Sequence, residues 1–211
     1  MPMPAMTTSI STARGQRRTE KFLDAAREVF IEQGYDAASV NEIVRRAGGS
    51  LATLYKRFGN KEGLFVAMIE RRALVIFAAL EESTLSSRAP EEALQDYGRH
   101  LLTLLLTPDA LAIYRLVINE AHRHPRLARE FLENGPFRVR RALAAYLEKQ
   151  CERGLFEIDD CWQAAAEFSG MLLSDLHTRA LVGLTPALEP AALERRIAGS
   201  VQRFLYGIVI D

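Results

Sequence analysis

Hydrophobic side chains recur at helical spacing along almost the whole chain, and the alternation typical of strands is nearly absent. The clearest stripe follows the i, i+3, i+4, i+7, i+8 pattern and consists of Phe22, Ala25, Ala26, Val29 and Phe30. This stripe predicts a helix over about residues 16–33, which Gly34 ends in a left-handed conformation. The pattern as a whole predicts an all-α protein.

Capping residues divide the next segment into three helices. In each case a Ser or Asn side chain can accept a hydrogen bond from a backbone N–H of the first turn. The predicted helices and their caps are 39–46 (Ser39), 50–57 (Ser50) and 60–82 (Asn60). Ser39 and Glu42 together form a capping box, and Gly48-Gly49 separates the first two of these helices.

Beyond residue 83, prolines mark where helices begin, because proline is tolerated at the first helical position. Five prolines precede helical patterns: Pro90, Pro108, Pro125, Pro136 and Pro190. Asp160 and Gln163 form a further capping pair. The predicted helices lie near 90–106, 108–122, 125–134, 136–153, 160–182 and 190–208. The chain is therefore expected to contain about ten helices.

The organisation predicted from these elements is a tail, a head and a body. Residues 1–15 form a disordered tail, residues 16–62 a three-helix head, and residues 63–211 a larger helical body. No Gly/Pro/Ser-rich linker separates the head from the body. The 60–82 helix is therefore expected to join the two parts rigidly.

Charge is distributed unevenly along the 211 residues, although Lys+Arg and Asp+Glu are both 27. The chain up to Lys61 contains ten basic and six acidic residues, and the remainder contains 17 basic and 21 acidic residues. A basic head on an acidic body predicts an anionic partner for the head alone.

The helices at 39–46 and 50–57 have the spacing of a helix-turn-helix, with a tight turn built from small residues. On a helical wheel, Leu54 and Phe58 point inward and Leu51 lies nearer the inner side. The outward face of the second helix is small, polar and basic, which suits the major groove of DNA. Its outward residues are Ala52, Thr53 and Lys56.

The remaining candidate DNA contacts are mostly groups that suit phosphate oxygens. The hydroxyls of Ser50, Thr53 and Tyr55 can bind phosphate without reading the sequence. Lys61 lies at the start of a helix, where its charge and the free backbone N–H groups both favour phosphate. The full candidate set is Ser39, Arg45, Ser50, Leu51, Ala52, Thr53, Tyr55, Lys56 and Lys61.

The identities of the residues in this segment match a known family more specifically than the helix spacing alone does. The segment from Ser39 to Phe65 contains Ala47-Gly48-Gly49-Ser50, Ala52-Thr53-Leu54-Tyr55 and Phe58-Gly59-Asn60-Lys61-Glu62. This pattern resembles the DNA-binding domain of the TetR/AcrR family of transcriptional regulators. The resemblance covers about residues 16–66. Gly49 stands where that family usually has valine, so the turn is expected to lose an apolar plug and gain flexibility. Leu51 stands where a polar residue is frequent, and at a helix start it could touch a thymine methyl group.

The body resembles the C-terminal domain of the AefR-like branch of that family, from about residue 90 to 205. The residues with the resemblance are the segment Ile113–Ala121, Pro125, Leu127, Phe131 and Gly135-Pro136. The resemblance implies a homodimer whose four-helix interface uses the helices near 160–182 and 190–208 of each subunit. It also implies a cavity for a small-molecule effector in each body, and a palindromic double-stranded operator.

Polar residues inside the apolar helices of the body are the candidates for effector binding, although residues of this kind are more often satisfied core groups or surface residues. They are His100, Arg115, Asn119, Asp175 and His177. No metal is expected, because His122 and His124 face different sides of a helix and no Cys or third His is near in sequence. No cofactor motif is found, so no cofactor is expected.

Several classes of protein are disfavoured. The longest strictly apolar run, Ala73–Leu80, is far shorter than a membrane span, and the N-terminus lacks the pattern of a signal peptide. Cys151 and Cys161 fit reduced thiols, although a redox pair stays open, and a cytoplasmic location is expected. An enzyme using Ser174, Asp175 and His177 is not expected, since their spacing fits no nucleophile turn.

The sequence therefore predicts a dimeric transcriptional repressor that a small-molecule effector releases from its operator. Two alternatives remain, a transcriptional activator of the same family and an α-helical interaction module that does not bind DNA.

Overall fold

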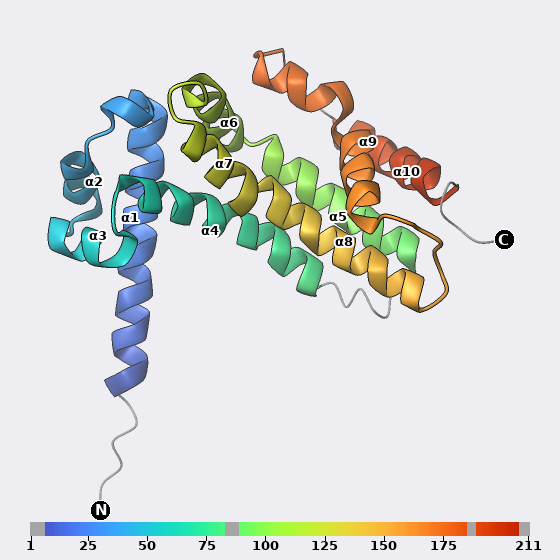
Figure 1. Ribbon diagram of the computed structural model, residues 1–211, viewed down its shortest axis with the longest axis horizontal. Helices are drawn as coiled ribbons and strands as arrows, with labels where there is room; N and C mark the ends of the chain where they lie inside the picture. Colours follow the sequence, from blue (N-terminus) through green and yellow to red (C-terminus); the bar gives the residue numbers. More distant parts are fainter. Residues whose placement is uncertain (1–6, 83–88, 185–188, 207–211) are drawn as a thin grey trace, which may run out of the picture.

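The computed structural model describes residues 7–82, 89–184 and 189–206, and the regular elements of these residues are ten α-helices (Figure 1). In chain order they are α1 (Thr7–Ala37), α2 (Val40–Ala47), α3 (Leu51–Phe58), α4 (Lys61–Glu82), α5 (Pro90–Leu105), α6 (Pro108–Glu120), α7 (Pro125–Asn134), α8 (Pro136–Glu152), α9 (Cys161–Leu181) and α10 (Pro190–Tyr206). The all-α class predicted from the sequence is confirmed.

Local capping chemistry explains most of the helix ends. The hydroxyl of Ser39 accepts a hydrogen bond from the Glu42 N–H at 3.5 Å, and that of Ser50 accepts from Thr53 N–H at 3.2 Å. Asp160 caps α9 in the same way, because its carboxylate accepts from Gln163 N–H at 2.9 Å. The five helices predicted to begin at prolines do begin there.

The start of α1 differs from the prediction. The helix begins at Thr7, so the part of the predicted disordered tail from residue 7 to 15 is helical, and residues 1–6 lie outside the described residues. No proline and a single glycine, Gly15, separate Thr7 from Gly34, so nothing ends the helix earlier. At Gly34, φ is 79° and ψ is 170°, so the predicted positive φ is present but the chain leaves in an extended direction.

The head has a core that continues into the body. Phe22, Phe30, Leu54 and Phe65 are fully buried at the centre of α1, α3 and α4. The same cluster includes side chains of α6 and α7: Ile113, Leu116, Val117, Leu127 and Phe131. The head boundary predicted near residue 62 therefore falls within a continuous helix, α4, and beside a shared core.

A second core lies between α5, α8, α9 and α10. Its fully buried residues include Leu94, Leu102, Leu147, Phe168 and Ile197. In Figure 1, α4 runs from the head at the left toward this bundle, and it packs on α1, α5, α7 and α8. α4 is thus the structural connection between the two parts, as the absence of a linker predicted.

None of the helices in the described ranges has, by itself, the length and hydropathy needed to cross a bilayer. The consecutive pair α5 and α6 reaches that length and hydropathy together, but the two helices are bent by 69°. Both helices contribute buried residues to the cores described above.

Candidate nucleic-acid interface

The turn between α2 and α3 is set by two glycines with different roles. Gly48 has φ 64° and ψ 40°, and its N–H donates to the Arg45 carbonyl at 3.3 Å, which ends α2 in a left-handed cap. A Cβ atom on Gly49 would lie 2.4 Å from Cζ of Phe22. The expectation that Gly49 leaves the turn without an apolar plug is therefore corrected, because the ring of Phe22 fills that space.

α3 presents an exposed face that no other part of the described chain covers. Leu54 is fully buried and anchors the helix, whereas Ala52, Lys56 and Tyr55 (47% exposed) are open to solvent. Leu51 is 37% exposed, so it lies on the outward side, contrary to the position expected from the wheel. The outward face of α3 includes the Lys56 ammonium, a phenol and two apolar groups, which is suitable for contact with base edges.

Hydroxyl groups at the start of α3 are already engaged in capping. Ser50 Oγ accepts from the Thr53 N–H and lies 2.9 Å from Thr53 Oγ1. Thr53 is half-buried, unlike the outward position expected for it. This arrangement fixes the first turn of α3. The backbone N–H groups of that turn and the hydroxyls of Ser50 and Thr53 lie beside the exposed face of the helix.

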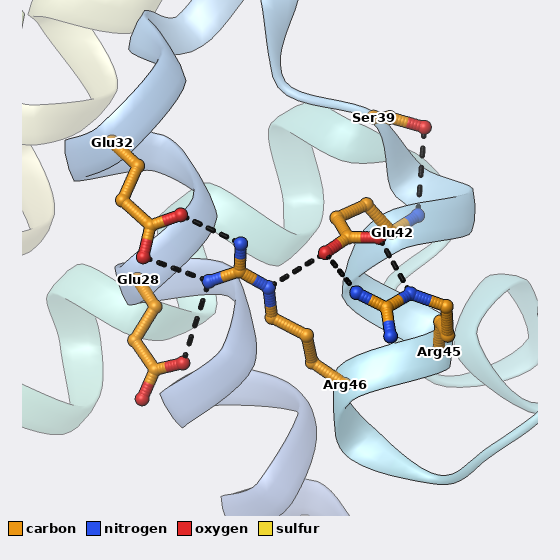
Figure 2. Close-up of polar contacts among 6 residues, drawn as sticks. All are labelled: Glu28, Glu32, Ser39, Glu42, Arg45 and Arg46. Atoms are coloured by element: carbon orange, nitrogen blue, oxygen red, sulfur yellow. Dashed lines mark hydrogen bonds and ion pairs between the residues drawn. The ribbon is translucent and has the colours of Figure 1, made fainter.

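Figure 2 shows an ionic network that holds α2 on α1. Arg46 Nε donates to Glu42 at 2.8 Å, and its Nη1 and Nη2 donate to the two carboxylate oxygens of Glu32 at 2.8 and 2.6 Å. Arg45 forms a two-bond pair with the same Glu42, at 2.8 and 2.6 Å, while its side chain stays 73% exposed. Arg46 thus orients α2, and Arg45 remains accessible to an external anion.

The ionic network around Glu42 predicts that part of the stability of the fold depends on pH. The hydrogen bonds from Arg45 and Arg46 lower the pKa of Glu42 from its ordinary value of 4.5 to about 2. A depressed pKa stabilises the folded form above about pH 4.5, and this contribution is lost as the pH falls toward 2. A carboxyl titration followed by NMR should give a midpoint for Glu42 well below that of an ordinary glutamate. In the Arg46→Ala variant the midpoint should move upward, and an unchanged midpoint would contradict the network.

Lys61 lies at the first position of α4, as predicted, but its side chain is partly engaged. Nζ donates to the Asp36 carbonyl at 3.0 Å and lies 4.8 Å from the centre of the Tyr35 ring. Burial lowers the pKa of Lys61, and the neighbouring carboxylates of Asp36 and Glu120 oppose this shift. Two of its three N–H donors remain for another acceptor.

The fold adds basic residues that the motif alone did not single out. Arg57, at the end of α3, donates to the hydroxyl of Thr19 on α1, which ties the two helices together. Arg17, Arg18 and Lys21 lie on the same turns of α1 and are exposed. The positive charge of this segment was visible in the sequence, but its position beside α3 requires the tertiary contact.

A largely apolar cavity of about 230 Å³ lies in the body, between α4, α5, α6, α7, α8 and α9. Its wall is mostly aliphatic and includes four aromatic rings: Tyr97, Tyr114, Phe131 and Phe137. Its polar groups include the Tyr97 hydroxyl, which lies 2.8 Å from Ser169 Oγ, and the guanidinium of Arg140. Burial raises the pKa of Tyr97 and Tyr114 to about 12, so both phenols are neutral near pH 7.

Two family descriptions match this chain. Residues 22–68 match "Bacterial regulatory proteins, tetR family", and residues 92–207, more than half of the chain, match "AefR-like transcriptional repressor, C-terminal domain". The chain belongs to the TetR family. It is a DNA-binding transcriptional regulator rather than an enzyme, because the members of this family act by regulating transcription.

Known TetR-family proteins resemble this chain in both sequence and fold. A regulator from Mesorhizobium loti MAFF303099 is 33% identical with a TM-score of 0.80, and the alignment covers 93% of this chain and 99% of that one. The flavonoid-responsive regulator FrrA is 34% identical with a TM-score of 0.76, over 92% and 98% of the two chains. The repressor ComR of Escherichia coli K12 is 36% identical over 111 residues, a match that spans 50% of this chain and about half of ComR.

The five effector candidates of this TetR-family protein do not line the cavity. Arg115 donates to the carbonyls of Leu181 and Ala180, both at 2.7 Å, and thereby caps the end of α9. His100 bonds the Asp96 carbonyl at 2.8 Å on an exposed surface.

The other three candidates are also near the surface or engaged in packing. Asp175 pairs with Arg179 and Arg196, and the ring of His177 packs on the cavity residue Tyr114 at 4.7 Å. Asn119 lines a shallow groove beside Arg115. Through this ring contact, His177 packs against the cavity wall from outside.

Proposed function

We propose that this TetR-family regulator is a dimeric repressor that a small, apolar aromatic effector releases from its operator. The observation that supports effector control is that three side chains, Ile69, Ile113 and Phe131, belong both to the cavity wall and to the core on which the head packs. A molecule that fills the cavity must press on these side chains, and packed interiors transmit such displacements rather than absorb them.

The DNA contacts are proposed to centre on α3 in a major groove. Ala52, Lys56, Tyr55 and Leu51 would face base edges or thymine methyl groups, and Arg45 would reach a base edge or the backbone. The backbone would be held by the remaining candidates: Ser39, Ser50, Thr53 and Lys61. The exposed basic residues of α1 extend this surface.

The dimer is proposed to form through α9 and α10. On the described part of these helices, Met171 and Tyr206 are large apolar side chains left exposed within this subunit. Gly170 is exposed, and a Cβ atom built on it meets no other atom within 4 Å. Small residues such as Gly170 and Ala198 on an outward face allow a second pair of helices to pack closely, as a two-fold interface requires.

The effector class follows from the chemistry of the cavity. Four aromatic rings in an otherwise aliphatic wall and a pair of neutral hydroxyls, Tyr97 and Ser169, favour a flat apolar molecule with a few oxygen atoms. The similarity to FrrA, whose name describes it as flavonoid-responsive, is consistent with a phenolic aromatic compound. Arg140, also on the wall, would favour a ligand with an anionic or strongly accepting oxygen.

The test is selection of bound DNA from a random pool, followed by release from the selected DNA with a panel of flavonoids. A palindromic site and release by a member of the panel are expected. In Ala166→Leu, which reduces the cavity, operator affinity should be retained while release requires at least about 10-fold more effector. Ala145→Leu, on the exposed side of α8, should respond like wild type. Selection of no specific DNA would contradict the proposal.

The role proposed for Lys61 makes a separate prediction. Lys61→Ala should weaken binding to all DNA sequences and reduce the slope of log K against log salt by about one for each phosphate that the lysine neutralises. Binding would be measured by fluorescence anisotropy at several salt concentrations. Lys149→Ala, a change at an exposed position of α8, is the matched control. An unchanged slope would show that Lys61 does not contact phosphate.

A further inference from the structure

Three metal-ligating side chains meet where the head joins the body. Asp36 comes from the end of α1, Glu120 from the end of α6, and His124 from the residue just before α7. One potential ligand atom from each lies within 4.8 Å of the others, and His124 Nε2 is 2.5 Å from Asp36 Oδ1. Sequence spacing does not reveal this cluster, because Asp36 is distant in the chain and Glu120 is a carboxylate rather than another His or Cys.

Glu120 is the unusual member of the cluster. It is only 6% exposed, and its Oε2 has no hydrogen-bond partner among the described residues. An ionised carboxylate that loses water without gaining a partner is strongly destabilising, and buried charges are normally paired or bound to a metal. The unpartnered oxygen therefore indicates that a positively charged ligand belongs beside it.

Lys61 is the cation that already approaches this cluster, and it is not sufficient. Its Nζ donates to the backbone carbonyl of Asp36, and the carboxylates of Asp36 and Glu120 act on it through their charges. One ammonium opposite two carboxylates leaves a net negative charge. A divalent cation would balance both carboxylates.

We propose that Asp36, Glu120 and His124 bind a divalent transition-metal ion of the zinc class. One imidazole nitrogen and two carboxylate oxygens match the donors that Zn²⁺ accepts, with water at a fourth position. Two ligands bound at about 2.0–2.1 Å lie about 3.3 Å apart on a tetrahedral ion. His124 Nε2 and Asp36 Oδ1 would therefore separate by about 0.8 Å, which rotation of two partly exposed side chains can supply.

The site would act at the joint, away from the effector cavity. None of its three ligands lines the cavity, and the ion would bond the end of α1 directly to α6 and α7. A dication beside Lys61 would also repel its ammonium and release it from the cluster. Metal occupancy would thus fix the head on the body and free a proposed phosphate contact, and this last consequence rests on the proposed function.

The test measures zinc binding directly, without DNA. The protein is the full chain without an affinity tag, and both cysteines are changed to serine, because Cys151 and Cys161 Sγ are 4.0 Å apart and could bind zinc themselves. Calorimetric titration with ZnCl₂ should give one site per subunit. Zinc at 100-fold above Kd should raise Tm by roughly 5–10 °C.

Matched variants then separate a metal site from an ordinary ionic cluster. His124→Gln should weaken zinc binding by at least about 10-fold, whereas His122→Gln, two residues away and exposed, should bind like the parent. Glu120→Gln should lose the zinc-induced rise in Tm without lowering the Tm of the metal-free protein. Lys61→Met should bind zinc more tightly, because the competing ammonium is gone.

Three results would overturn the proposal. They are the absence of zinc binding, equal affinity in the two histidine variants, and a lower metal-free Tm in Glu120→Gln, which would show that Glu120 is stabilising without a metal. A failure to bind operator DNA would contradict the proposed function and would leave the zinc titration unaffected.

Discussion

Ala52→Glu is expected to lower operator affinity by at least about 100-fold, because each subunit would place a carboxylate on the exposed face of α3 against the negative charge of DNA. The change should leave the fold intact, since Ala52 is exposed and glutamate is a good helix former. Fluorescence anisotropy with the selected operator would measure the decrease.

The matched control for this charge is Ala145→Glu on α8, which adds the same charge at an exposed position of the body. It should reduce affinity by less than about 3-fold, because α8 belongs to the core of the body and an exposed charge acts over only about 8–10 Å at ordinary salt. If Ala52→Glu and Ala145→Glu had equal and small effects, α3 would not be the helix that faces DNA.

Gly49→Val is expected to destabilise the protein by about 1–3 kcal/mol and to reduce operator binding with it. Even a Cβ atom at this position would lie 2.4 Å from the ring of Phe22, which is fully buried and cannot swing aside freely. The added side chain must therefore displace the ring or push α3 away from α1. Urea unfolding would give the change in the free energy of unfolding.

A double-mutant cycle tests the cause of this effect. Phe22→Leu alone should be destabilising because it leaves a cavity, but Phe22→Leu with Gly49→Val should recover part of the stability that each change removes alone. The coupling energy is expected to be at least about 1 kcal/mol in the favourable direction. Strictly additive effects would show that the two side chains do not compete for the same space.

Much of the fold could be predicted because helix ends depend on local chemistry. Ser39, Ser50 and Asp160 cap helices within one turn of themselves, and the prolines restrict only their immediate neighbours. The predicted helices therefore end within a few residues of the observed ones. The predicted start of α1 was wrong because a Ser/Thr-rich segment without prolines can continue a helix that has already formed beyond it.

The candidate sites were predictable to different degrees. Leu54 and the exposure of Ala52 and Lys56 follow from a helical period of 3.6 residues, whereas Leu51 at the first turn does not, because its surroundings depend on where α1 lies. Gly49 could be interpreted only with Phe22 in view, 27 positions earlier in the chain.

The cavity was the feature that was hardest to predict from the sequence. Polar residues such as Arg115 and Asp175 stand out in apolar helices, but they are satisfied by carbonyls and arginines of other helices. The wall consists instead mostly of common apolar residues from six helices, and their convergence is a property of tertiary packing alone.

Ile69, Ile113 and Phe131 belong both to the cavity wall and to the core of the head. This shared packing has a thermodynamic consequence. Equilibrium linkage is reciprocal, so a molecule that weakens operator binding by a given factor must itself bind the DNA-occupied protein more weakly by that same factor. The operator-bound regulator would consequently bind the effector more weakly than the free regulator does. Under the proposed function, copies that are free of operator would therefore bind the effector before operator-bound copies do.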